Sequence, residues 1–208
     1  MKIIALIPAR AGSKRLIGKN FKSLSGQPLI SWTIKTAKKV KEISDIFVST
    51  NDTKINKISN ELNVKVPWKR PKYLSGNKVS SANVALHFLK WYEKKYSNPD
   101  GLLLLQPTSP FRKKSSIKKA IRLFKNNKNK AVVSFSPIIK KKKSLKKMED
   151  FNKKLKLNGS IYLISPKNLK KHKSFFKPTV LPLIQNSLKE SIDIDTYDDW
   201  KAAEKLKK

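Results

Sequence analysis

The feature that most constrains the fold is the N-terminal segment, residues 1–20, where an apolar run is followed by a basic loop. Residues 3–7 form an unbroken run rich in β-branched side chains, which is typical of a buried parallel strand. The run ends at Pro8, and the loop that follows contains two glycines, a serine and four cations: Gly12, Gly18, Ser13, Arg10, Lys14, Arg15 and Lys19. Glycines let backbone N–H groups approach an anion, and cations neutralise it. Because open α/β sheets bind ligands at the carboxyl ends of their strands, this segment predicts a polyphosphate site.

The spacing of this loop matches neither of the two common phosphate-binding loops. A Walker loop needs a glycine, four residues and then Gly-Lys-Ser/Thr, and the dinucleotide fingerprint needs three spaced glycines. Neither pattern occurs in residues 8–20. The segment therefore predicts a phosphate site of another class.

The rest of the chain alternates between strand-like and helix-like patterns. Strand patterns occupy residues 45–49, 64–66, 102–105, 131–135 and 180–184, and helical patterns occupy residues 29–40, 53–62, 80–96, 115–124 and 197–206. Residues 154–157 and 160–164 are expected to form two short strands joined by Asn158-Gly159, a strong hairpin signal. The alternation predicts an α/β fold with a doubly wound, mainly parallel sheet and a small β-hairpin extension. We interpret residues 1–208 as one domain, with residues 138–165 as an excursion from it.

The charge of the chain is extreme, because 48 basic residues outweigh 14 acidic ones to give a formal net charge of +34. Such a charge favours acidic partners, including nucleic acids and anionic membrane surfaces. However, only five of the basic residues are arginine, the residue that base and phosphate recognition favours, and the lysines are spread along the whole chain. We therefore interpret most lysines as solvated and do not expect a nucleic acid as the partner.

Cysteine is absent from the chain, and no apolar run is long enough to span a membrane. Without cysteine, the chain cannot use a disulfide, a thiol nucleophile or a thiolate metal ligand. The apolar start is shorter than a signal peptide and is interrupted by Pro8 and Arg10. These features predict a soluble cytoplasmic protein.

Two further stretches carry polar groups that suit a site at the same edge of the sheet. Asp193 and Asp195 are two positions apart in a strand-like stretch, so their carboxylates are expected to face the same side. Hard oxygen ligands near a triphosphate suit Mg²⁺. The apolar run 102–105 leads into Gln106 and then a turn made rigid by two prolines, which predicts that Gln106 and Ser109 are presented at the ligand edge.

Taken together, these motifs resemble the acylneuraminate cytidylyltransferases, the family of the CMP-sialic acid synthetases. The resemblance covers nearly the whole chain and rests on residues 8–14 (PARAGSK), 19–20 (KN), 105–110 (LQPTSP), 158–162 (NGSIY) and 191–195 (SIDID). It implies a Rossmann-like nucleotidyltransferase fold. It also implies an enzyme that transfers CMP from CTP to a nine-carbon 2-keto sugar acid of the sialic, legionaminic or pseudaminic type, with release of pyrophosphate.

The resemblance also implies roles for individual residues. The predicted catalytic residues are Arg10, Lys14 and Lys19, which hold the triphosphate, and Asp193 and Asp195, which bind Mg²⁺. The predicted nucleotide-binding residues are Ala9, Gly12, Ser13, Asn20, Arg70, Ser80 and Ser81. The predicted sugar-binding residues are Gln106, Thr108, Ser109, Lys156 and Asn158.

Two alternatives stay open at this point. One is a cytidylyltransferase for the eight-carbon acid 3-deoxy-manno-octulosonate. The other is a non-catalytic basic protein of the same fold that binds RNA or acidic surfaces through residues 140–147. The region ahead of Asn158 is shorter than in the family and lacks its arginine, so the identity of the sugar and the formation of a homodimer are both left open.

Overall fold

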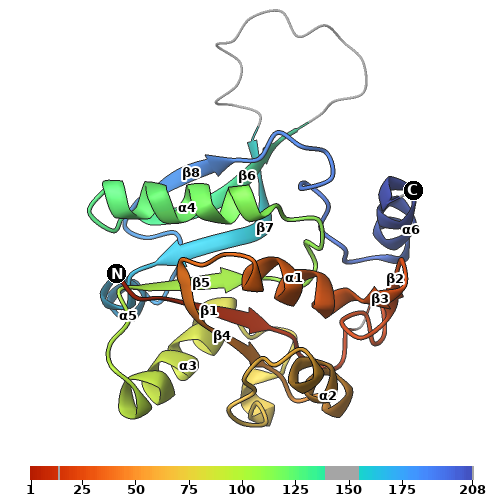
Figure 1. Cartoon of the computed structure of the whole chain (residues 1–208), viewed down its shortest axis with the longest axis horizontal. Coiled ribbons are helices and arrows are strands. Elements are labelled where there is room, and N and C mark those ends of the chain that lie inside the picture. Colours follow the sequence, from red (N-terminus) through yellow and green to blue (C-terminus); the bar gives the residue numbers. More distant parts are fainter. Residues whose placement is uncertain (14, 139–154, 208) are drawn as a thin grey trace, which may run out of the picture.

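The computed structural model describes residues 1–13, 15–138 and 155–207 and places six strands in one sheet (Figure 1). Their order across the sheet is β4-β1-β5-β7-β6-β8. The strands are β1 (Ile3–Pro8), β4 (Ile43–Ser49), β5 (Gly101–Leu105), β6 (Ala131–Pro137), β7 (Leu155–Ile164) and β8 (Val180–Ile184). Strand β1 is parallel to β4 and β5, and β6 is parallel to β8, whereas β7 is antiparallel to both of its neighbours. The prediction of a mainly parallel sheet is confirmed.

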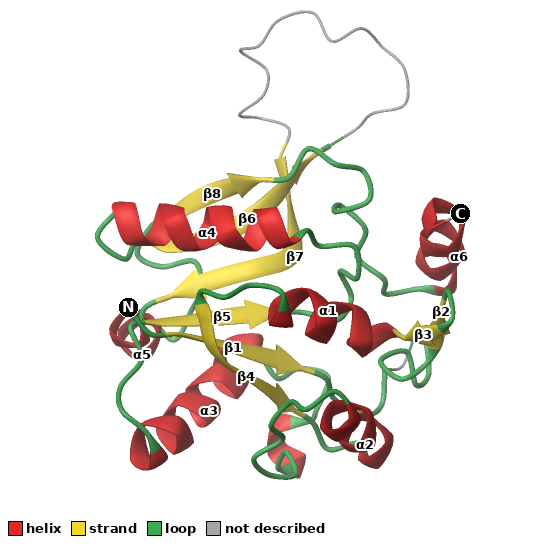
Figure 2. Cartoon of the chain, viewed as in Figure 1, coloured by secondary structure: helices red, strands yellow, loops and turns green. Residues whose placement is uncertain are grey.

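The side chains of β1 show why helices must cover both faces of this sheet. Ile3, Ala5 and Ile7 belong to one apolar cluster, and the alternating residues Ile4 and Leu6 belong to another. The first cluster includes residues of α1 (Leu29–Lys38), α2 (Thr53–Glu61) and α4 (Lys114–Asn126), and the second includes residues of α3 (Ser81–Lys95) and α5 (Pro166–His172). Figure 2 shows these two helical layers in front of the sheet and behind it. The doubly wound arrangement is therefore confirmed.

A third apolar cluster joins the last helix to a small hairpin that follows the N-terminal loop. Helix α6 (Tyr197–Lys207) contributes Trp200 and Ala203, and the hairpin of β2 (Ser23–Leu24) and β3 (Gln27–Pro28) contributes Leu24. Ile194, just ahead of α6, is fully buried in the same cluster. Burial of these apolar side chains brings residues 193–195 beside the N-terminal loop.

The predicted hairpin at Asn158-Gly159 is wrong, because both residues lie within the continuous strand β7. Gly159 has a φ of +69°, and the pairing of β7 with β6 shifts between Val133 and Phe135, so the two residues form a bulge rather than a turn. Buried partners for the Asn158 side chain keep the chain in the sheet, as described below. A short hairpin does form between β2 and β3, where Ser25 and Gly26 adopt φ values of 49° and 83°.

Two other predicted strands are not formed. Residues 64–66 make only an isolated bridge, in which Lys65 pairs with Phe47 of β4. Residues 192–194 are an irregular segment whose main link to the sheet edge is a 2.8 Å hydrogen bond from the Ile194 amide to the Thr108 carbonyl. Among the described residues, neither stretch pairs with a neighbouring strand over more than an isolated contact. Within the described residues, no helix has the length and apolar character needed to cross a membrane.

The start of α2 leads to a first prediction, on stability. Asp52 Oδ1 accepts hydrogen bonds from the amides of Lys54 at 2.8 Å and Ile55 at 3.3 Å, as expected for an N-cap. Replacing Asp52 by alanine should lower the free energy of unfolding by about 1 kcal/mol in urea titrations. Glu61→Ala, at the exposed end of the same helix, is the matched control and should change it by less than about 0.5 kcal/mol. Equal effects of the two substitutions would contradict the capping role.

Candidate active site

A cavity of about 550 Å³ opens where β1 and β5 end. It lies at the carboxyl edge of the parallel strands, the position at which this class of sheet binds ligands. Its walls come from the N-terminal loop, the segment between α2 and α3, the turn after β5 and the segment before α6. The polar and charged residues that line it are Arg10, Ser13, Arg15, Lys19, Asn20, Arg70, Asn77, Ser81, Gln106, Thr108, Asp193 and Asp195.

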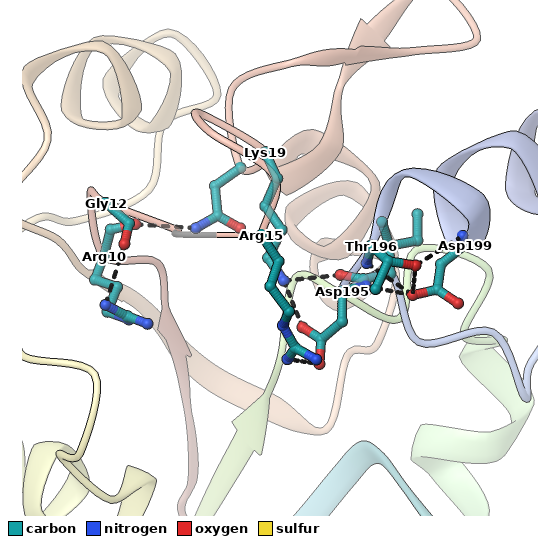
Figure 3. A network of polar contacts seen from close by, with 9 residues as sticks. Arg10, Gly12, Arg15, Lys19, Asp195, Thr196 and Asp199 are labelled. Atoms are coloured by element: carbon teal, nitrogen blue, oxygen red, sulfur yellow. Dashed lines mark hydrogen bonds and ion pairs between the residues drawn. The ribbon is translucent and has the colours of Figure 1, made fainter.

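Asp195 connects the two ends of the chain within this cavity (Figure 3). Its Oδ1 lies 2.7 Å from Lys19 Nζ, and its Oδ2 lies 2.6 Å from an Arg15 guanidinium nitrogen. Lys19 is buried and also donates a 2.8 Å hydrogen bond to the Ile194 carbonyl, whereas Arg15 is largely exposed. The basic loop and the late aspartates are thus brought together, as the interpretation of the sequence requires.

Arg10 holds the other side of the loop in place. One guanidinium nitrogen donates to Asn77 Oδ1 at 2.6 Å, and more weakly to the carbonyls of Ser75 and Gly12 at 3.4 and 3.3 Å. Asn20 in turn donates through Nδ2 to the Arg10 carbonyl at 3.2 Å. The loop is therefore braced between the segment that precedes α3 and its own C-terminal part.

Arg70 places a second cation deep in the wall of the cavity. Its side chain is almost fully buried and donates through Nε to Ser49 Oγ at 3.0 Å, and through a terminal nitrogen to the Ser49 carbonyl. Within the described ranges it has no carboxylate partner. Burial and, to a smaller extent, the nearby positive charge of Arg10 together lower the pKa of Arg70 to about 10. A buried cation of this kind favours an anionic ligand, which would supply the missing counter-charge.

The two aspartates provide the cavity with hard oxygen ligands. Partial desolvation raises the pKa of Asp193, a hydrogen bond from Thr108 lowers it, and the nearby charge of Asp195 raises it while that of Lys19 lowers it, with a net increase. In the part of the chain that the structure describes, no three metal-binding side chains cluster together. Mg²⁺ commonly takes one or two carboxylates and completes its coordination with water and substrate phosphate. The two carboxylates therefore suit Mg²⁺, provided that a phosphate-bearing ligand in the same cavity supplies further oxygen ligands.

Gln106 and Ser81 meet on the opposite wall. Gln106 Nε2 donates to Ser81 Oγ at 3.4 Å, and both residues line the cavity. Ser80, by contrast, points away as the N-cap of α3, where its Oγ accepts a hydrogen bond from the Asn83 amide at 3.1 Å. Of the predicted serine pair, only Ser81 faces the site.

Several other predicted site residues do not line the cavity. Ala9 is buried behind it, where its amide donates to the Ser49 carbonyl at 2.9 Å. Ser109 is buried with no partner for its Oγ among the described residues. Asn158 is buried in a polar network, and Lys156 is exposed on β7. Gly12, in the loop itself, does not line the cavity either. The predicted residue Lys14 lies outside the described residues.

Three residues with clear roles were not among the predicted site residues. Arg15 binds Asp195, Asn77 binds Arg10, and Arg112 is completely enclosed beside Gln106. Arg15 lies in the basic loop between the predicted residues Lys14 and Lys19, so the positive charge of that loop could have indicated it. Arg112 ends the proline-containing turn after β5, but nothing in the sequence indicates that its side chain turns inward.

A doubly wound sheet whose carboxyl edge joins a basic loop, a buried arginine and two carboxylates defines a nucleotidyltransferase type of site. The comparisons agree with this class: a family model described as cytidylyltransferase matches residues 4–203. The chain belongs to the cytidylyltransferase family and is a nucleotidyltransferase.

Two curated relatives and one solved structure illustrate the similarity. The chain is 40% identical to the CMP-N,N'-diacetyllegionaminic acid synthase of Legionella pneumophila, over 99% of this chain and 96% of that protein. It is 32% identical to the N-acylneuraminate cytidylyltransferase of Streptococcus agalactiae serotype V, over 96% of this chain and 52% of that longer protein. The structure of a CMP:2-keto-3-deoxy-manno-octonic acid synthetase complexed with CTP superimposes with a TM-score of 0.74, covering 100% of this chain and 98% of the other. At 15% identity, that structure supports the fold alone.

Proposed function

We propose that this enzyme transfers the cytidylyl group of CTP to a nine-carbon 2-keto sugar acid and releases pyrophosphate. The observation that carries the proposal is one cavity that is lined together by three cations, Lys19, Arg10 and Arg70, and by the carboxylates of Asp193 and Asp195. An acceptor of the N,N'-diacetyllegionaminic type is favoured, because the relative named for that sugar aligns over almost the full length of both chains. The single-domain organisation of residues 1–208 is part of the same proposal.

The cations of the cavity would bind the triphosphate. Lys19 and Arg15 already hold one anion, the Asp195 carboxylate, at 2.7 and 2.6 Å. Arg70 is buried without a carboxylate partner in the described part of the chain, and Arg10 is fixed at the opposite edge of the loop. Charge-assisted hydrogen bonds from such groups are about twice as strong as neutral ones. We place Lys14 in the same role on the sequence motif alone.

The carboxylates of Asp193 and Asp195 would hold Mg²⁺ against the phosphates. When bound, the metal ion supplies neutralisation of the charge that develops on the transferred phosphoryl group. The raised pKa of Asp193 means that its carboxylate ionises, and becomes available to a cation, at a higher pH than that of an ordinary aspartate. Lys19 and Arg15 position Asp195 before any ligand arrives.

The chemistry asked of the protein is mainly positioning. The anomeric hydroxyl of the sugar acid attacks the α-phosphorus in line, a new oxygen–phosphorus bond forms, the bond to the pyrophosphate oxygen breaks, and the hydroxyl proton is released. Gln106 and Thr108 line the cavity beyond the basic loop and would orient the acceptor. Holding both reactants in line can supply most of the required rate acceleration.

Pyrophosphate release is the direct test of this proposal. The enzyme is incubated with CTP, Mg²⁺ and each of four acids: N,N'-diacetyllegionaminic, sialic, pseudaminic and 3-deoxy-manno-octulosonic acid. We expect release with a nine-carbon acid, fastest with the legionaminic one, and little release when UTP replaces CTP. Release with the octulosonate alone would favour the eight-carbon alternative. No release with any acid, together with salt-sensitive RNA binding, would favour a basic binding protein of this fold.

Pairing of two chains is a separate expectation. Contacts between two subunits are expected in the excursion at residues 138–165. This excursion includes residues 139–154, which lie outside the described residues. Whether the enzyme is a homodimer is therefore left to analytical ultracentrifugation, in which a single species of twice the 23.8 kDa chain mass would support it.

A further inference from the structure

The carboxamide of Gln106 packs directly on the bulge of β7. A Cβ placed on Gly159 would lie 2.6 Å from Gln106 Oε1, which is closer than real Cβ contacts come. Gly159 also has a φ of +69°, which glycine adopts without strain. On its other side the carboxamide donates through Nε2 to Ser81 Oγ at 3.4 Å. The amide group therefore lies between a bare backbone surface and the start of α3.

Arg112 ties this bulge to the backbone of Gln106. The guanidinium is buried and donates through Nε to the Ser160 carbonyl at 2.8 Å and through a terminal nitrogen to the Gln106 carbonyl at 2.7 Å. Its other terminal nitrogen reaches Thr33 Oγ1 of α1 at 3.3 Å. A single planar group with several fixed donors thus sets the distance between the end of β5 and β7.

Hydrogen bonds of the Asn158 side chain with β6 and with Gln185 also hold the bulge in place. The buried Asn158 side chain accepts a 2.6 Å hydrogen bond from Ser134 Oγ, and it donates to Ser136 Oγ at 2.7 Å and to Gln185 Oε1 at 2.6 Å. Gln185 continues this network by donating to the buried Glu190 at 3.1 Å. Because every one of these groups is buried and paired, moving the bulge would break several hydrogen bonds at once.

We propose that residues 158–160 and Arg112 form a clamp that positions the Gln106 carboxamide for the acceptor sugar acid. The clamp is a positioning device and makes no contact with substrate itself. With Oε1 against Gly159 and one N–H directed at Ser81, the second N–H of Gln106 is available to a hydroxyl or carboxylate oxygen of the acceptor. The proposal rests on the proposed function, because it assigns Gln106 to the acceptor rather than to CTP.

Two glycine substitutions test the clamp with a matched control. Gly159→Ala should raise the KM for the acceptor by roughly 10- to 100-fold, because it displaces Gln106, while the KM for CTP stays within about twofold. Gly26→Ala is the control, since Gly26 has a φ of +83° but no atom within 4 Å of an added Cβ. It carries the same backbone strain without a contact, and both KM values should stay near those of the wild type. Equal effects of the two substitutions on the acceptor would overturn the clamp.

A double-mutant cycle separates positioning from general damage. In a Gln106→Ala background the carboxamide is gone, so adding Gly159→Ala should change the acceptor KM by less than about twofold. Independent, multiplying effects would overturn the proposal. If Gly159→Ala does not fold, Arg112→Lys serves as the second variant and Thr33→Val as its control, because Thr33 accepts a hydrogen bond from a different terminal nitrogen of Arg112 than Gln106 does.

Failure of the clamp and failure of the function give different results. A wild-type enzyme that releases no pyrophosphate with any acid overturns the proposed function, and the positioning role falls with it. An active wild type in which Gly159→Ala and Gly26→Ala behave alike, or in which Arg112→Lys and Thr33→Val behave alike, overturns the clamp alone.

Discussion

Replacing Lys19 by methionine is expected to lower kcat/KM for CTP by about 10²- to 10³-fold, the range seen when one preorganised donor is removed from a reacting oxyanion. Lys19 is buried, and its ammonium group is held by the Ile194 carbonyl and the Asp195 carboxylate inside the cavity. Methionine keeps most of the length and packing of the side chain but removes the charge. The measurement is steady-state pyrophosphate release together with the CTP dissociation constant.

Lys22→Met is the matched control for this prediction. Lys22 lies three positions further along the same loop, but its Nζ sits over the rings of Tyr197 and Trp200, at 5.4 and 5.1 Å, outside the cavity lining. Its kcat/KM for CTP should therefore stay within about threefold of the wild type, since the substitution removes only two cation–π contacts of a half-buried side chain outside the cavity. Similar losses of kcat/KM in the two variants would show that the loop acts through its total charge and that the position of Lys19 in the cavity does not matter.

Asp195→Asn is the second substitution with a large expected effect. It should reduce kcat at saturating Mg²⁺ by about 10²- to 10³-fold, because a neutral amide binds a hard cation poorly and the transition state loses charge neutralisation. CTP affinity measured without Mg²⁺ should instead stay equal or increase, because Arg15 and Lys19 lose the carboxylate that now occupies them. A lower kcat with Mg²⁺, together with an equal or higher CTP affinity without Mg²⁺, would indicate that Asp195 binds the metal ion rather than holding Lys19 in place.

Asp198→Asn is the control for this second prediction. Asp198 is exposed in the first turn of α6 and does not line the cavity, so the same chemical change should leave kcat near the wild-type value. Metal-free CTP binding that weakens in Asp195→Asn would contradict the metal-binding role and assign Asp195 to positioning Lys19. Titration calorimetry with Mg²⁺ and CTP, separately and together, provides both readouts.

Much of the fold follows from local pattern. The β-branched run of residues 3–7 ends at Pro8 and is apolar on both faces, which is typical of a buried parallel strand, and it forms β1. Asp52 before a helical pattern predicts an N-cap, and its carboxylate makes those hydrogen bonds. The location of the ligand site could also be predicted from the sequence, because parallel strands bring their carboxyl ends to the same edge of the sheet wherever their exact bounds fall.

Local pattern failed where long-range partners compete with it. Asn158-Gly159 is a hairpin signal taken alone, but Ser134, Ser136 and Gln185 offer the Asn158 side chain three buried hydrogen bonds that a solvent-exposed turn would lose. The strand expected at residues 192–194 fails for the opposite reason. Within the described residues, its link to the sheet edge is the hydrogen bond from the Ile194 amide to the Thr108 carbonyl, and no strand of the sheet pairs with it.

The sequence by itself therefore determined the chemistry of the site: a basic glycine-containing loop, a strand-end glutamine and two late carboxylates. Only the tertiary structure decided which of these groups meet. Burial of Ile194 beside Leu24 and Trp200 carries Asp195 to Lys19 and Arg15, and the inward turn of Arg112 joins Gln106 to β7. The physical reason is that side-chain identity is written in the chain, whereas the distance between residues remote in sequence is set by which apolar surfaces are buried together.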